Sequence, residues 1–185
     1  LHYKKINVNY TGADISSFFV EKSKSMFPNV KFNLTNESLN DNLDSEYDFV
    51  YCRGVSIHQS RPLKFLENLI NKSKKCCVFD INTRDLGETI YDVDKSCQYI
   101  AGTWIPHIVV NFDELIEFLK KFEKIKKSRI QINKYHKILG GQQSRFLPKE
   151  MYDTKTGCAQ TSVSIDLEAD KEEFIFSNKQ EILKK

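Results

Sequence analysis

The sequence lacks several features that would assign a protein to a class at once. It has no apolar stretch long enough to cross a bilayer and no signal peptide, so we expect no membrane association. Its net charge is only +3, too small to attract the phosphate groups of a nucleic acid strongly. We therefore expect no nucleic-acid partner. Its five cysteines include no pair with zinc-ligand spacing. We therefore expect a cytoplasmic protein in a reducing compartment, with no metal site.

What is present is the composition of a globular domain. The chain has 185 residues, of which 40% are hydrophobic and 29% are charged. We expect a single domain over residues 1–185, with a long loop at 140–160 that is functional or mobile. The first residue is Leu1 rather than Met, and we expect the sequence to begin inside a longer natural chain.

The predicted elements follow the order strand, helix, strand, linker, strand, helix, strand. The helices are expected from Ser16 or Ser17 to Met26 and from Pro62 to Ile70. The strands are expected at Thr11–Ala13, Val30–Leu34, Phe49–Cys52 and Cys76–Phe79. This alternation predicts an α/β fold with a mostly parallel, Rossmann-like sheet and helices on both faces.

The rest of the chain predicts a different kind of pairing. Arg129–Lys134 and Ser162–Leu167 alternate apolar and polar residues, which predicts a C-terminal antiparallel strand pair. Before them, Asn111 can cap a helix that extends to about Glu123. The segment Tyr99–Val110 is apolar but interrupted, so we expect it to cover the core without being part of it.

The stretch from Tyr47 to Gly54 organises the functional prediction. Phe49–Cys52 is a short apolar run without helical periodicity, which predicts a strand buried on both faces. Ligands collect at the carboxyl ends of such strands, and Arg53, Gly54, Ser56 and His58 follow this one. By the same reasoning, Asp80 to Thr83 form the polar tip after Cys76–Phe79.

Three motifs along the chain form a pattern. They are Gly12-Ala13-Asp14-Ile15-Ser16, then Tyr47-Asp48-Phe49-Val50 with Arg53-Gly54-Val55 and His58, then the helix from Pro62 with Cys77-Val78-Phe79-Asp80. In this order they resemble the second-strand, fourth-strand and fifth-strand segments of class I S-adenosylmethionine-dependent methyltransferases. The resemblance covers about residues 8 to 139, and the last hairpin more loosely. It implies S-adenosyl-L-methionine as cofactor and methyl transfer to a small-molecule acceptor.

The resemblance assigns a cofactor role to the first motif. Asp14 would accept hydrogen bonds from the ribose hydroxyls, and such charge-assisted bonds are strong. Gly12 would lie against the cofactor, and Ile15 would pack on the adenine face. The alternative is that Asp14 only stabilises the start of the following helix.

Two later positions also match the cofactor site. Asn36, followed by Glu37, stands where the family usually has an acid that contacts the adenine amino group. Arg53 would line the pocket near the methionine end, and its alternative role is an ordinary salt bridge.

His58 is the catalytic candidate, because its loop would lie above the reacting end of the cofactor and a neutral imidazole can accept a proton. His107 and Tyr99 are second choices, and Asp80 would orient the substrate or a base. The alternative for His58 is a loop residue with a satisfied side chain.

One part of the family pattern is absent, because no glycine-rich run such as G-x-G-x-x-G precedes Gly12. In the family, that strand lies between the second and the fourth, so its absence would leave a gap of about 9–10 Å between unpaired edges. We expect an upstream segment or a partner chain to complete the sheet. The alternative is a non-catalytic scaffold with this fold, or a subunit of a larger assembly. A nicotinamide-dependent oxidoreductase would also need the glycine turn, and the sequence has no Tyr-x-x-x-Lys pair in a suitable helix.

Overall fold

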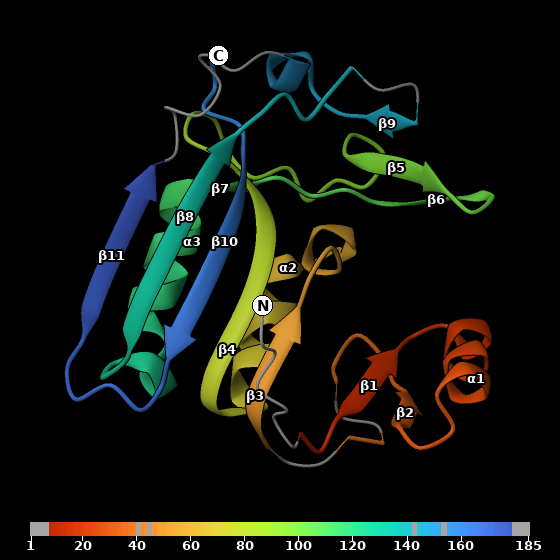
Figure 1. The fold of residues 1–185 in the computed structure, drawn as a ribbon. Coiled ribbons are helices and arrows are strands. Elements are labelled where there is room, and N and C mark those ends of the chain that lie inside the picture. Colours follow the sequence, from red (N-terminus) through yellow and green to blue (C-terminus); the bar gives the residue numbers. More distant parts are fainter. Residues whose placement is uncertain (1–7, 40–41, 44–45, 142–143, 153–154, 179–185) are drawn as a thin grey trace, which may run out of the picture. The chain divides into compact units, whose positions relative to one another are not determined.

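Two parallel strands and one helix form the N-terminal part of the chain. The computed structural model describes residues 8–39, 42–43, 46–141, 144–152 and 155–178, and the chain divides into unit 1 (residues 1–45) and unit 2 (residues 46–185). Unit 1 contains β1 (Thr11–Asp14), α1 (Ser17–Met26) and β2 (Lys31–Leu34) (Figure 1). Both strands and the helix lie where the sequence predicts them.

Local signals define the elements of unit 1. The Ser16 hydroxyl caps α1 by accepting a hydrogen bond from the Phe19 N–H at 3.4 Å. The strands run parallel, with Asp14 opposite Leu34, and the Thr35 N–H donates to the Asp14 carbonyl at 3.0 Å. The polar ends of the two strands therefore lie at the same edge of this small sheet.

Unit 2 is built on a six-stranded sheet with the order β11-β8-β10-β4-β3, and β7 also pairs with β4. The strands are β3 (Tyr47–Cys52), β4 (Ser73–Arg84), β7 (Val110–Asn111), β8 (Arg129–His136), β10 (Ala159–Asp166) and β11 (Glu173–Asn178). Strand β10 is antiparallel to both β4 and β8, whereas the other pairs are parallel.

The predicted antiparallel pair is confirmed, because Ser164 of β10 lies opposite Gln131 of β8. The sheet is nevertheless mixed rather than mostly parallel. The reason is that β10 lies between β4 and β8 and is antiparallel to both.

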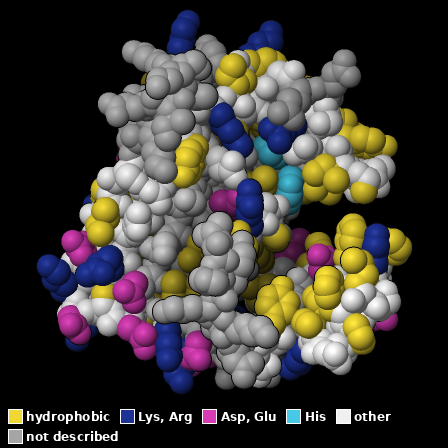
Figure 2. Space-filling model, viewed as in Figure 1, with side chains coloured by type: hydrophobic (Ala, Val, Ile, Leu, Met, Phe, Trp, Pro, Cys, Tyr) yellow, Lys and Arg dark blue, Asp and Glu magenta, His cyan; other side chains and the backbone are white. Residues whose placement is uncertain are grey.

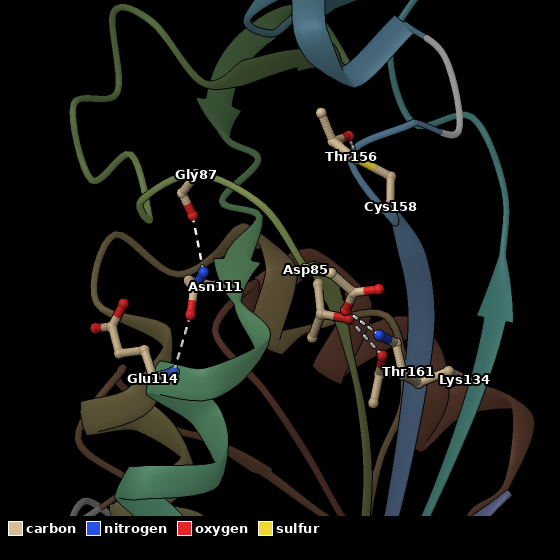
Figure 3. Close-up of polar contacts among 9 residues, drawn as sticks. Asp85, Gly87, Asn111, Glu114, Lys134, Thr156, Cys158 and Thr161 are labelled. Carbon is tan, nitrogen blue, oxygen red and sulfur yellow. Dashed lines mark hydrogen bonds and ion pairs between the residues drawn. The ribbon is translucent and has the colours of Figure 1, made fainter. Parts of the chain in front are cut away.

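Two helices of unit 2, α2 (Pro62–Asn71) and α3 (Phe112–Lys121), lie on the same face of this sheet (Figure 1). Helices were expected on both faces of the sheet, but α2 and α3, the α-helices in the described residues of unit 2, both lie on one face of its main sheet (Figure 1). The helices cover the sheet through fully buried side chains such as Leu66 and Leu115. Asn111 caps α3 as predicted: its Oδ1 accepts the Glu114 N–H at 3.1 Å, while its Nδ2 donates to the Gly87 carbonyl at 2.8 Å (Figure 3).

Strand β3 differs from the prediction of a strand buried on both faces. Phe49 is 58% exposed and Tyr51 is 59% exposed, and their rings stack with centroids 6.5 Å apart. In the part of the chain that the structure describes, β3 pairs only with β4 and is the last strand of the sheet. Its aromatic residues were therefore correct indicators of a strand, but they do not belong to the core.

Strand β4 continues beyond the point where a polar tip was expected. Asp80 to Thr83 lie inside the strand, and the expectation of a loop there is wrong. Their polar groups have partners on neighbouring elements: the Thr83 hydroxyl, for example, lies 2.6 Å from that of Thr161 on β10 (Figure 3). A buried polar residue is tolerated in a strand when such partners exist, and they cannot be seen in the local sequence. Just after β4, Asp85 forms an ion pair with Lys134 of β8 (Figure 3).

A three-stranded antiparallel sheet lies beside the main one in the fold of unit 2. It contains β5 (Cys97–Ile100), β6 (Thr103–Pro106) and β9 (Arg145–Phe146). Strands β5 and β6 form a hairpin whose turn residues, Ala101 and Gly102, have φ angles of 51° and 87°. Positive φ at both positions is the geometry of a tight hairpin turn.

The covering segment and the expected long loop both contain buried residues. Ile108, Val109 and Val110 are fully buried, so the end of the Tyr99–Val110 segment belongs to the core, against expectation. The 140–160 segment contains β9 and a 3₁₀ turn, and β10 begins at its end. A buried cluster joins these segments and consists of Val109, Leu139, Leu147, Met151 and Cys158. None of the helices among the described residues is both long and apolar enough to cross a membrane.

Candidate functional site

The end of β1 presents an exposed carboxylate. One oxygen of Asp14 accepts the Ser16 N–H at 2.8 Å, and the other has no hydrogen-bond partner among the described residues. A small hollow of about 110 Å³ lies beside it and is lined in part by Gly12, Phe19 and Phe32. Ile15 is exposed at the same strand end. Unit 1 therefore places three of the predicted cofactor residues together: Gly12, Asp14 and Ile15.

The turn after β2 carries the other predicted residues of unit 1. The Asn36 Oδ1 accepts both the backbone N–H and the hydroxyl of Ser38, at 3.1 Å and 2.6 Å. Glu37 between them is exposed. Because β1 and β2 are parallel, this turn lies at the same edge of the small sheet as Asp14. The oxygen that we assigned to adenine is thus used inside the turn, and the adenine role of Asn36 stays a prediction.

In unit 2, the end of β3 is tied to the middle of β4. The Gly54 N–H donates to Asp80 Oδ1 at 2.6 Å, and Gln160 Nε2 donates to the other Asp80 oxygen at 2.9 Å. Asp80 is buried, and Gly54 adopts φ +69°, a conformation that favours glycine. Arg53 is exposed at this turn. Although Asp80 is not at a strand tip, the parallel register brings it level with the end of β3, as the prediction required.

His58 lies in the 3₁₀ turn Ser56–His58 that follows. Its Nδ1 is 2.9 Å from the Pro106 carbonyl oxygen, which can only accept a hydrogen bond. Nδ1 therefore carries the proton, and in the neutral ring Nε2 presents its lone pair. The Ser56 hydroxyl holds the same turn by donating to the Asp80 carbonyl. The half-buried His58 ring is thus oriented with one nitrogen left to accept a proton.

The other histidine of this region, His107, is fully buried. Its Nε2 lies 3.2 Å from the Asn82 amide nitrogen, and its ring centroid is 5.6 Å from that of His58. Burial lowers the pKa of His107 to about 3, with smaller contributions from Arg145, His58 and Lys137. His107 is therefore uncharged at neutral pH, and burial makes it a poorer base candidate than His58.

Two basic residues complete this region, and the sequence analysis did not find them. The Lys137 ammonium donates to Gln160 Oε1 at 3.0 Å, and an Arg145 terminal nitrogen donates to the Leu139 carbonyl at 3.1 Å. Burial lowers the pKa of both side chains, and the Arg145 charge lowers that of Lys137 further. Neither forms an ion pair with a carboxylate within residues 46–141, 144–152 and 155–178.

We call these side chains the polar cluster of unit 2: His58, Asp80, Asn82, His107, Lys137, Arg145 and Gln160. They come from segments far apart in the sequence, and no local motif marks Lys137 or Arg145. Figure 2 shows histidine side chains next to lysine or arginine side chains on the face in view. Tyr99, a second-choice catalytic residue, is exposed on β5 with its ring 5.4 Å from Trp104. No three His, Cys, Asp or Glu side chains gather to hold a metal ion in the described part of the chain.

Comparison with known proteins gives a clear result only for the fold. No protein-family model matches the chain, and no curated protein matches its sequence. Among solved structures, an S-adenosylmethionine-dependent methyltransferase from Methanosarcina mazei matches with a TM-score of 0.54 and 12% identity, over 89% of this chain and 82% of that one.

Two further structures match about as well. An O-methyltransferase of a Brevibacillus brevis polyketide synthase, in complex with S-adenosyl-L-homocysteine, has a TM-score of 0.53 and 14% identity over 84% of this chain. The [4+2]-cyclase SpnF has a TM-score of 0.50 and 10% identity over 84% of this chain. This chain spans 57% of the first and 65% of the second. The likeness shows that the chain has the fold of class I S-adenosylmethionine-dependent methyltransferases.

Proposed function

We propose that this chain acts in the transfer of a methyl group from S-adenosyl-L-methionine to a small-molecule acceptor. The observation that carries the proposal is the fixed His58 ring within a methyltransferase fold. Its Nδ1 is held by the Pro106 carbonyl, which leaves Nε2 as the nitrogen that can accept a proton. A base of this kind is useful where the acceptor atom must lose a proton as the methyl group is transferred.

The residues of unit 1 fit half of the cofactor. The open oxygen of Asp14 is suited to a ribose hydroxyl, and the exposed Ile15 side chain offers an apolar surface for adenine. When bound, the cofactor supplies an electrophilic methyl group. Arg53, exposed at the end of β3, stays our candidate for the methionine end.

The polar cluster performs the positioning in this proposal. The buried Asp80 carboxylate holds the Gly54 turn from one side and the Gln160 amide from the other, so it fixes the backbone from which His58 projects. Positioning contributes much of the rate in transfer reactions, because reacting atoms must be aligned before the bond forms. Asp80 therefore acts as a positioning residue, and His58 as the proton acceptor.

The open edge of β3 supports the expectation of a further strand. In the described residues this edge has no partner, and exposed aromatic rings lie along the strand. Unpaired edges are sites for strand addition. We propose that a segment outside the described residues or a partner chain supplies a strand beside β3. The expected spacing between β1 and β3 stays a prediction, because the two strands lie in different units.

A binding titration tests the proposal. S-Adenosyl-L-homocysteine is titrated into the protein by calorimetry, with NADH as the control ligand for the dinucleotide alternative. We expect saturable binding of the first, and an increase in the unfolding temperature, because a ligand that binds only the folded state stabilises it. Binding of NADH alone would replace the proposal with an oxidoreductase.

The second candidate function is a scaffold without methyl transfer. One observation favours it: a [4+2]-cyclase matches this fold, so the fold also serves proteins named for other reactions. A chain that binds neither ligand, even when the strand next to β3 is supplied, would be assigned to this second function.

A further inference from the structure

We propose that the acceptor carries a carboxylate group, and that Lys137 and Arg145 bind it. This inference rests on the proposed function, because it names the class of acceptor for the same site. It starts from an imbalance in the polar cluster: among the described residues, neither Lys137 nor Arg145 has a carboxylate partner, and both act on the buried His107 ring next to His58.

Lys137 is accessible but has no carboxylate partner. Its ammonium has three protons, and its one hydrogen bond among the described residues goes to the neutral amide oxygen of Gln160, at 3.0 Å. At least one proton therefore remains to bind a ligand oxygen. The Gln160 amide is itself held by Asp80 at 2.9 Å, so the position of the ammonium is defined through this chain of hydrogen bonds.

Arg145 is also incompletely used. One terminal nitrogen donates to the Leu139 carbonyl, whereas the buried Nε has no partner in the part of the chain that the structure describes. A guanidinium presents paired donors that match the two oxygens of a carboxylate. A buried donor without a partner is unfavourable, so a ligand oxygen here would relieve a penalty as well as add an attraction.

His107 connects the two cations to the base. Its ring lies 5.6 Å from that of His58, and the charges of Arg145 and Lys137 both act on it. The ring nitrogen that does not face Asn82 is also buried without a partner among the described residues. A ligand bound by the two cations would therefore lie in the same polar cluster as His58.

The net charge of the cluster favours a carboxylate over a phosphate. Lys137 and Arg145 contribute +2, and Asp80 contributes −1. His107 is neutral at pH 7, and His58 must be neutral to act as a base. The sum is +1, which one carboxylate neutralises, whereas a phosphate dianion would leave the site at −1 and close to Asp80. Because Asp80 is buried, a second unbalanced negative charge near it would be costly.

The test compares two probes of the same shape that differ in charge. Benzoate and benzamide are titrated separately into isotope-labelled protein, with inorganic phosphate as a third ligand, and amide shifts near residues 137 and 145 are followed by NMR. We expect benzoate to bind in this region, benzamide to bind at least about tenfold more weakly, and phosphate to bind no more tightly than benzoate. Loss of a charge-assisted hydrogen bond has this order of effect.

Variants show whether the two cations are responsible. Lys137→Gln and Arg145→Gln should each weaken benzoate binding roughly 10- to 100-fold, and Arg145→Lys should restore part of it. The matched controls are Lys121→Gln and Arg129→Gln, which remove exposed cations elsewhere. Binding of S-adenosyl-L-homocysteine by each variant reports that it is folded.

Each outcome has a distinct meaning. Equal binding of benzoate and benzamide, or benzoate binding that both variants retain, overturns the inference. Tighter binding of phosphate overturns the choice of a carboxylate. A further outcome is that the wild-type protein binds benzoate through both cations and yet fails to bind S-adenosyl-L-homocysteine. The proposed function and the acceptor assignment are then both overturned, and the cations are shown to bind an anion for another purpose.

Discussion

The strand ends of the two units hold their polar side chains in different ways. In unit 1, the carboxylate of Asp14 and the amide oxygen of Asn36 accept hydrogen bonds from residues two positions further along the chain. In unit 2, Asp80 is bound by Gln160, which is 80 residues away, and Asn82 contacts His107, 25 residues away. Asp14 and Asn36 in unit 1 are thus exposed and held by local contacts, whereas the polar cluster of unit 2 is assembled from distant segments and is partly buried.

This difference indicates a division of labour. Exposed, locally ordered groups such as Asp14 can exchange water for ligand hydroxyls at little cost. Groups locked into a buried network, such as Asp80, cannot move freely, so they are suited to fixing the geometry of a base. Four predictions, from the largest expected effect to the smallest, test this contrast.

The largest effect is expected for His58→Asn. The amide nitrogen of Asn occupies roughly the position of the ring Nδ1, so the hydrogen bond to Pro106 is retained while the Nε2 proton acceptor is lost. Removing a general base typically lowers kcat by about 10²- to 10⁴-fold. Methyl transfer to a carboxylate-bearing acceptor, followed with labelled cofactor, provides the measurement. His136→Asn, at a histidine of β8 outside the polar cluster, is the control. A kcat for His58→Asn within threefold of wild type would contradict the assignment.

A second prediction compares the packing of the two units. Phe79→Ala in β4 removes a ring that is 1% exposed and should lower the free energy of unfolding by about 3–5 kcal/mol. Phe18→Ala in α1 removes a ring that is 67% exposed and should change it by less than about 0.5 kcal/mol. Urea denaturation measures both. A large loss for Phe18→Ala would mean that another surface covers α1 in solution.

The same contrast explains how much could be predicted from the sequence. The strands β1, β2, β3, β8 and β10, part of β4, and the caps of Ser16 and Asn111 were predicted, because periodicity and capping are local signals. The strands β5, β6, β7, β9 and β11 were not predicted. The Asp14 and His58 positions follow from motifs of a few residues. Asp14 is the last residue of β1, and His58 lies in the 3₁₀ turn that follows β3.

The errors have a common physical cause. Asp80 to Thr83 look like a loop because they are polar, but partners such as Thr161 and Gln160 satisfy them inside the sheet. Phe49 and Tyr51 look like core residues, but β3 is the last strand of its sheet in the described chain. Lys137 and Arg145 had no signal at all, since only the pairing of distant strands brings them to the cluster.

The third prediction concerns the exposed carboxylate of unit 1. Asp14→Asn keeps an oxygen to accept the Ser16 N–H but removes the charge offered to the ribose. We expect binding of S-adenosyl-L-homocysteine to weaken by about 1.5–3 kcal/mol in calorimetry, the range for a hydrogen bond to a charged group. Asp48→Asn, an exposed change on β3, is the matched control. An unchanged affinity for Asp14→Asn would leave Asp14 with only its local role at the start of α1.

The smallest effect at neutral pH is a pH dependence of stability that comes from the buried network of unit 2. Burial lowers the pKa of His107 to about 3 in the folded state, whereas an unfolded histidine titrates near 6.5. Between these values the unfolded chain binds the extra proton, so the free energy of unfolding falls as the pH falls. The free energy of unfolding changes with pH by at most about 1.4 kcal/mol per pH unit for one such histidine. Above pH 7 this slope approaches zero.

His107→Gln isolates this contribution. The glutamine side chain can keep a contact with Asn82 but does not titrate, so its urea-denaturation stability should depend less steeply on pH than that of the wild type between about pH 6.5 and 3. Every carboxylate titrates in both proteins, and the difference between the two curves therefore reports His107 alone. Parallel curves would mean that the folded protein lets the imidazole take up a proton. The two cations beside it would then have to be balanced by an anion or by water reaching the cluster, and the neutral-ring argument for a carboxylate-bearing acceptor would fail.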